Sequence, residues 1–131
     1  MPDEPVWLEP LQRVGLALAI GFLVGVERGW KQRDDGEGQR VAGIRTFALI
    51  GLLGGVSGLL LPAVGATPVA AMALGFGASF AAFQFRQAMK DGDNSVTSTV
   101  AGLLVFALGL YAVVGETVVA AAVAVAGTTV L

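Results

Sequence analysis

Five long apolar segments dominate this chain and limit what it can fold into. They cover residues 8–26, 44–61, 68–85, 96–114 and 117–131. A helix rises 1.5 Å per residue, so 18–19 residues span about 27–28 Å, close to the hydrocarbon thickness of a bilayer. The segments do not alternate between polar and apolar residues as barrel strands do. The sequence therefore predicts an all-α membrane protein, a single domain over residues 1–131 built as a bundle of five transmembrane helices.

The composition supports the same fold class. Hydrophobic residues make up 55% of the chain and charged residues 14%, whereas soluble domains have roughly 45–50% and 25%. The fifth segment has 15 residues, which span about 22 Å as a helix. No polar residue terminates it, so we expect that the last helix is cut by the end of the chain.

The basic residues predict the orientation of the helices. Seven of the eight Lys/Arg flank the loops after the first and third segments: Arg28, Lys31, Arg33, Arg40, Arg45, Arg86 and Lys90. Arg13 is the remaining one, and it follows Glu9 by four residues, a spacing at which the two side chains pair on a helix. Cytoplasmic loops carry the excess of Lys and Arg. This predicts the N-terminus outside, both basic loops in the cytoplasm, and the C-terminus in the cytoplasm.

The absence of Cys and His excludes several kinds of chemistry. The chain has no Cys or His, which leaves no thiol nucleophile, no imidazole base and no Cys/His zinc site. No recognisable nucleophile motif is present among the remaining residues. We therefore expect no enzymatic activity.

Glycines are spaced for close helix packing. Gly21 and Gly25 form one GxxxG pattern, and the second segment holds two more, made by Gly51, Gly54, Gly55 and Gly58. Small residues four apart let helix backbones approach closely in lipid. This pattern is explained by packing inside one subunit. The alternative is a seam between two copies in a homodimer.

Half of the chain's charge gathers between the first two segments. Residues 25–46 hold five of the eight Lys/Arg and four of the ten Asp/Glu. Most of these charges fit a solvated cytoplasmic loop. Glu27 differs, because a short carboxylate beside hydrocarbon needs a partner. Arg45 and Arg28 are the candidates, with the hydroxyl of Thr46, and together they would form a clasp joining the first two helices.

A second polar cluster, which contains Asp93, precedes the fourth segment on the same predicted side. Each of its polar residues is explained by capping of the fourth helix. The alternative is that both loops meet and that Glu27 and Asp93 bind a cation. Mg²⁺ takes oxygen ligands, often one or two carboxylates with waters. This chemistry permits Mg²⁺ without indicating it, and no cofactor is certain.

At these residues the chain resembles the N-terminal membrane domain of the MgtC/SapB family. The resemblance is carried by IGFLVGVERG, then AGIRTFALIGLLGG, then DGDNSVTSTVAGLLVFALG, over roughly residues 11–114. By position, the family motif corresponds to Gly25, Glu27, Arg28, Ala42, Gly43, Arg45 and Thr46, and the later Asp of the family to Asp93. The first loop is longer and more acidic than is usual in the family.

The resemblance implies a five-span inner-membrane protein of bacteria or archaea that is linked to magnesium homeostasis. The resemblance is compatible with two alternative functions. The first is transport of Mg²⁺, against which stands the lack of charge in the middle of segments two to five. The second is a regulatory or scaffold module that binds other membrane proteins through glycine-rich helix faces. The partners to expect are the lipid bilayer, other membrane proteins and a second copy of the chain, but no nucleic acid.

Overall fold

The computed structural model describes residues 5–31, 43–91 and 93–130, with the side chains of residues 31, 87–91, 93–98 and 130 left out. This part of the chain forms five helices: α1 (Leu8–Lys31), α2 (Ile44–Val64), α3 (Ala66–Asp91), α4 (Asp93–Val114) and α5 (Thr117–Val130). The all-helical architecture is the one that the sequence predicts. It follows from the long apolar runs, since a helix satisfies all of its own backbone groups without water.

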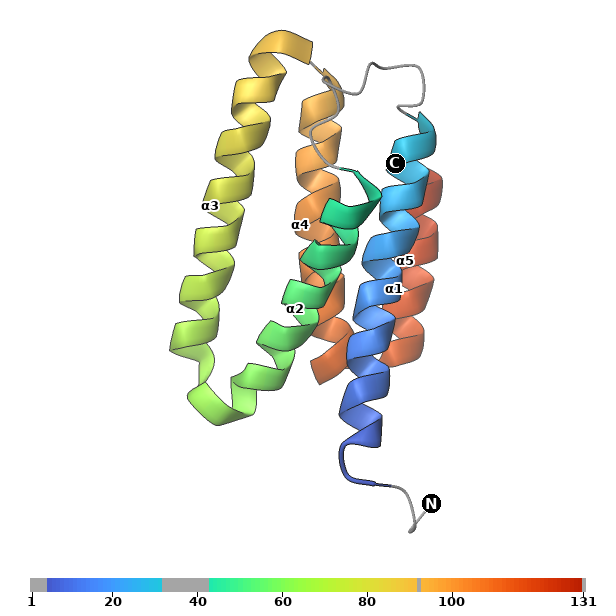
Figure 1. Ribbon diagram of the computed structural model, residues 1–131, viewed down its shortest axis with the longest axis vertical. Coiled ribbons are helices and arrows are strands. Elements are labelled where there is room, and N and C mark those ends of the chain that lie inside the picture. Colours follow the sequence, from blue (N-terminus) through green and yellow to red (C-terminus); the bar gives the residue numbers. More distant parts are fainter. Residues whose placement is uncertain (1–4, 32–42, 92, 131) are drawn as a thin grey trace.

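The helices run alternately up and down (Figure 1). One end of the bundle, which we call the loop end, contains the last residues of α1 and α3 and the first residues of α2 and α4. The opposite end, where α1 begins and where tight turns join α2 to α3 and α4 to α5, is the turn end. The loop end is the one at which the sequence places seven of the eight Lys/Arg.

The helices extend beyond the apolar segments. α2 runs three residues past Leu61, through Pro62, to Val64. Pro62 has no amide hydrogen to donate, but it lies in the last turn of α2, so only one backbone hydrogen bond near the end of the helix is missing. Gly65 then ends α2 with a φ of +87°, and its amide donates to the Leu61 carbonyl at 2.9 Å. Glycine adopts this left-handed conformation without strain, which permits an abrupt reversal into α3.

Three of the helices meet the length and hydropathy of a membrane span: Leu8–Trp30, Ile44–Val64 and Ala66–Arg86. Two further apolar helices are shorter, Thr99–Val114 and Thr117–Thr129. Large apolar side chains are exposed around the bundle, including Leu74, Phe85 and Val118 at 69–75%. An apolar surface of this extent belongs against lipid rather than water.

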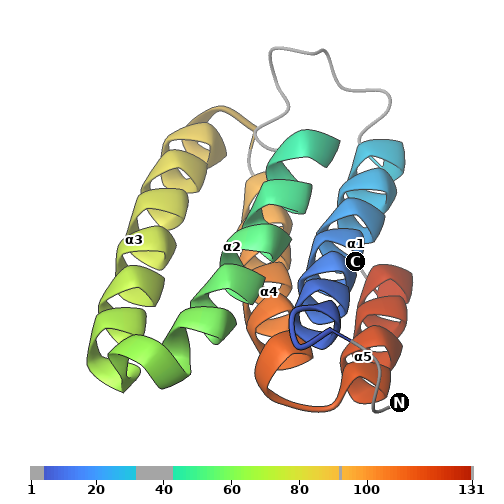
Figure 2. The same cartoon turned by 60° about the horizontal axis from the view of Figure 1, so that its bottom comes forward.

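α1, α2 and α4 form the centre of the bundle, with α3 and α5 outside them (Figures 1 and 2). One core cluster joins these three helices to the inner face of α3, and it includes Val24, Phe47, Val105 and Phe80. A second joins α1 and α4 to α5 through small residues such as Ala17, Ala112 and Ala124. α3 contributes much less, since 6% of its span is buried.

Glycines set the distances between the three central helices. A Cβ built on Gly21 would meet the backbone of Phe47 in α2, and one on Gly51 would meet the Ala17 carbonyl in α1. Gly54 lies in the same way against the Phe106 carbonyl of α4. A Cβ built on Gly55 would lie 2.9 Å from the Cβ of Ala17, and one built on Gly58 would lie 2.8 Å from the Cβ of Val113. All five glycines therefore lie in contacts within the chain, and a homodimer seam would have to use other faces.

Candidate functional site

Arg28 is buried at the loop end of α1. It follows Gly21 and Gly25 along one face of the helix, and it is 3% exposed. The neighbouring Glu27 is half-buried, and its carboxylate interacts electrostatically with the Arg28 guanidinium. Glu27 and Arg28 both lie within the candidate membrane span Leu8–Trp30, and charged groups in such a span are expensive and, as a rule, functional or structural in role.

The start of α2 lies against α1 at this level. A Cβ on Gly25 would lie 2.8 Å from the Cα of Ile44, so the two backbones are almost in contact. Gly43 precedes α2 in an extended conformation, and because it has no side chain, no side-chain hydrogen bond caps the start of the helix. Arg45 and Thr46 follow in the first turn, where both are exposed. The structure thus brings the two halves of the motif together, and the joining of Glu27 to Arg45 stays a prediction.

The predicted cation ligands are only partly described. α4 begins at Asp93, but the side chain of this residue lies outside the described part of the structure, as does Ala42 of the motif. Within the described residues, no group of three or more His, Cys, Asp or Glu is placed to hold a metal ion. Pairing of Glu27 with Asp93 around Mg²⁺ therefore stays a prediction.

Gln84 of α3 is a second buried polar group at the loop end. It is 1% exposed, and neither its amide nitrogen nor its amide oxygen has a hydrogen-bond partner in the described part of the chain. Gln84 lies one turn beyond Phe80 in α3, and Arg28 lies one turn beyond Val24 in α1. Val24 belongs to a core cluster against which Phe80 packs. Because α1 and α3 run in the same direction (Figure 1), Arg28 and Gln84 both lie beyond that cluster, toward the loop end.

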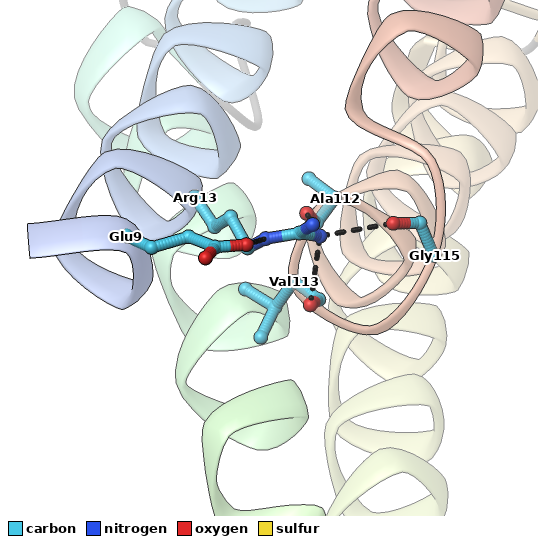
Figure 3. Close-up of polar contacts among 5 residues, drawn as sticks. All are labelled: Glu9, Arg13, Ala112, Val113 and Gly115. Atoms are coloured by element: carbon cyan, nitrogen blue, oxygen red, sulfur yellow. Dashed lines mark hydrogen bonds and ion pairs between the residues drawn. The ribbon is translucent and has the colours of Figure 1, made fainter. Parts of the chain in front are cut away.

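At the turn end, Arg13 joins α1 to the end of α4 (Figure 3). Its Nη1 donates to the carbonyls of Ala112, Val113 and Gly115 at 3.2, 3.1 and 2.9 Å. Its Nε donates to Glu9 Oε1 at 3.1 Å, which confirms the predicted pairing four residues apart. The last carbonyls of a helix lack intrahelical donors and carry its negative dipole, so a guanidinium is well suited to cap them.

Two hollows, each of about 430 Å³, flank the Glu9–Arg13 pair. The first lies between α1, α2 and α4, and beyond the charged pair its walls are mainly apolar, including Val6, Leu59 and Val113. The second lies between α1 and the start of α5, where Gln12 and Thr117 add polar groups. The charged pair is common to both hollows.

Some of these polar groups can be found from the sequence, and others cannot. Arg13 and Glu9 are visible as a pair, but the three carbonyls lie about a hundred residues further along the chain, and no side chain marks them. Gln84 is visible only as an amide inside an apolar segment, where its burial depends on which face of α3 meets α4. Gln84 is not among the site residues predicted from the sequence.

Comparison with known proteins agrees with the resemblance in the motif. A family model described as the MgtC family matches residues 14–131. The match extends through α5, further than the resemblance at residues 11–114. Neither the curated proteins nor the solved structures contain a match.

Proposed function

The chain belongs to the MgtC family, and from this premise we propose that it serves magnesium homeostasis as a regulatory module in the inner membrane of a bacterium or archaeon. In this proposal it binds a second membrane protein and does not itself carry Mg²⁺. All five helices cross the membrane, with the N-terminus outside and the loop end in the cytoplasm, where its basic residues would lie.

The observation that carries the proposal is the packing of the central helices. Gly51 of α2 lies against the Ala17 carbonyl on one side, and Gly109 of α4 lies against the Gly51 carbonyl on the other. Backbones in contact leave no room for a hydrated cation between α1, α2 and α4. A cation pathway through a membrane protein is normally lined by polar side chains or broken helices near the midplane.

Two serines with described side chains, Ser57 and Ser79, also support a role other than conduction. Ser57 is fully buried, and its hydroxyl donates to the Leu53 carbonyl of its own helix at 2.8 Å. Ser79 of α3 is exposed on the outside of the bundle. Neither hydroxyl is therefore presented to an internal path.

α3 offers the surface that would meet a partner. Gly75 is exposed, and a Cβ built on it would meet nothing within 4 Å. Small residues on a membrane helix allow another helix to approach closely. Gly21 and Gly25 of α1, the GxxxG glycines of α2 and Gly109 of α4 already pack within the chain, whereas Gly75 lies on the span that is least buried, and α3 is therefore the face proposed for a partner.

Transport of Mg²⁺ is the second candidate, and Glu27 is the observation that favours it. A half-buried carboxylate beside Arg28 at the predicted cytoplasmic edge is the arrangement expected at the mouth of an ion path. Such a path would have to run outside the glycine-packed centre, at an interface between copies of the chain.

Flux measurements separate the two functions. Purified protein is reconstituted into liposomes that contain a Mg²⁺-sensitive dye, and the native chain is compared with Glu27→Gln and Glu27→Ala after each has shown an unchanged elution profile. The proposal predicts the same dye signal from native protein and protein-free liposomes. A Mg²⁺ influx that requires Glu27 would overturn it and establish transport.

Growth under magnesium limitation tests the regulatory role directly. In a deletion strain that requires the chain in low Mg²⁺, Gly75→Leu is expected to abolish growth at an unchanged level of membrane protein. Gly15→Leu is the matched control, because Gly15 of α1 is also exposed with nothing within 4 Å of its Cβ position. Equal growth of both variants would contradict a partner surface on α3.

A further inference from the structure

We propose that the turn end of the bundle holds a binding site for a phospholipid with a primary ammonium headgroup, such as phosphatidylethanolamine. The site consists of the two hollows on either side of the Glu9–Arg13 pair. The proposal is independent of magnesium handling, and it goes beyond the proposed function.

The shape of the site suits an amphiphile that lies across it. The first hollow is bounded by apolar residues from α1, α2 and α4, among them Pro10, Leu59 and Pro62, and it is open at the surface of the bundle. It is therefore suited to the upper part of an acyl chain. The second hollow contains the polar groups of Gln12 and Thr117, and it is suited to a headgroup. The charged pair connects them, since both residues line both hollows.

The bonds already made by the pair leave groups of both charge signs available. Glu9 accepts the Arg13 bond through Oε1, and its side chain is 72% exposed, so Oε2 remains free to accept hydrogen bonds. Arg13 donates through Nε and Nη1, and no contact in the described part of the chain uses Nη2 (Figure 3). A ligand that presents an ammonium to Glu9 and a phosphate to Arg13 would complement both.

Charge complementarity selects the headgroup. An ethanolamine ammonium has three N–H donors for Glu9, whereas a choline headgroup has the same charge and no N–H donor. A glycerol headgroup has no cation, and it would leave the Glu9 carboxylate facing an anionic lipid.

Native mass spectrometry of the detergent-solubilised protein measures this selectivity. The protein is titrated with phosphatidylethanolamine, phosphatidylcholine and phosphatidylglycerol of identical acyl chains, and the apparent Kd of the first bound lipid is compared. We expect phosphatidylethanolamine to bind about fivefold or more tightly than either of the others, because a charge-assisted hydrogen bond is lost with each.

Glu9→Gln is the decisive variant, because glutamine keeps the size and the acceptor for Arg13 but removes the charge. The preference for phosphatidylethanolamine should fall below about twofold. Glu116→Gln is the matched control: Glu116 is an exposed carboxylate at the same end that does not line the apolar hollow. It should keep the native preference, and both variants should keep the native melting temperature.

Four outcomes would overturn the proposal. Equal affinity of the native chain for all three lipids would indicate nonselective lipid around the bundle, and tightest binding of phosphatidylglycerol would indicate an anion site on Arg13. An unchanged preference in Glu9→Gln, or an equal loss in Glu116→Gln, would show that Glu9 does not select the headgroup.

Discussion

Gly51→Ala should weaken the bundle by separating α1 from α2. A methyl group at this position would overlap the Ala17 carbonyl, and it would lie 3.1 Å from the nitrogen and 3.2 Å from the Cα of Gly21. Ordinary contacts begin at 3.4 Å. All three neighbours are backbone atoms that cannot rotate away, so α1 itself has to move.

The magnitude follows from two opposing effects. A gap of about 0.5–1 Å between packed surfaces forfeits about a quarter to a half of their dispersion energy, and overpacked sites typically lose about 1–3 kcal/mol, occasionally more. Replacing glycine with alanine inside a helix returns up to about 1 kcal/mol. We therefore expect a net loss of up to about 2 kcal/mol in the free energy of unfolding relative to the native chain, and of about 1–3 kcal/mol relative to a glycine-to-alanine change that causes no overlap.

The assay is unfolding in mixed micelles, with helix content followed by circular dichroism as the fraction of SDS rises. Gly77→Ala is the control, since its new methyl would meet the Leu103 side chain at 3.7 Å, an ordinary contact. That variant should be neutral or more stable by up to about 1 kcal/mol. If Gly51→Ala unfolds at the same SDS fraction as Gly77→Ala, the close backbone approach of α1 and α2 is refuted.

Three further substitutions test the polar groups by the same assay. Arg13→Gln should lose about 1–3 kcal/mol because it uncaps three carbonyls at the end of α4. Glu9→Gln should leave the free energy of unfolding nearly unchanged, because it keeps an acceptor for Arg13 and removes only the charge of a largely exposed pair. Equal losses in the two variants would show that capping contributes nothing. Gln84→Met should raise the free energy of unfolding by about 1–3 kcal/mol, because an apolar side chain of similar length replaces a buried amide without hydrogen bonds. A loss of stability would show that the amide has a stabilising partner.

The sequence alone determined that this chain is a helical membrane protein, because runs of apolar residues near bilayer length leave the backbone no other way to bond in lipid. It also determined the spacing of the glycines and the pairing of Glu9 with Arg13, since both depend only on the 3.6-residue period of a helix. The glycine-rich helices and the motif around Glu27 were sufficient to predict the family.

Tertiary structure decided which faces of the helices meet. The GxxxG pattern of α2 is compatible with a partner inside or outside the chain, and only the packed bundle assigns Gly51 to α1 and Gly54 to α4. The burial of Gln84 and the capping of α4 by Arg13 depend in the same way on neighbours far along the chain. Periodicity specifies that a face exists, but its partner is fixed by the free energy of the whole arrangement, to which every helix contributes at once.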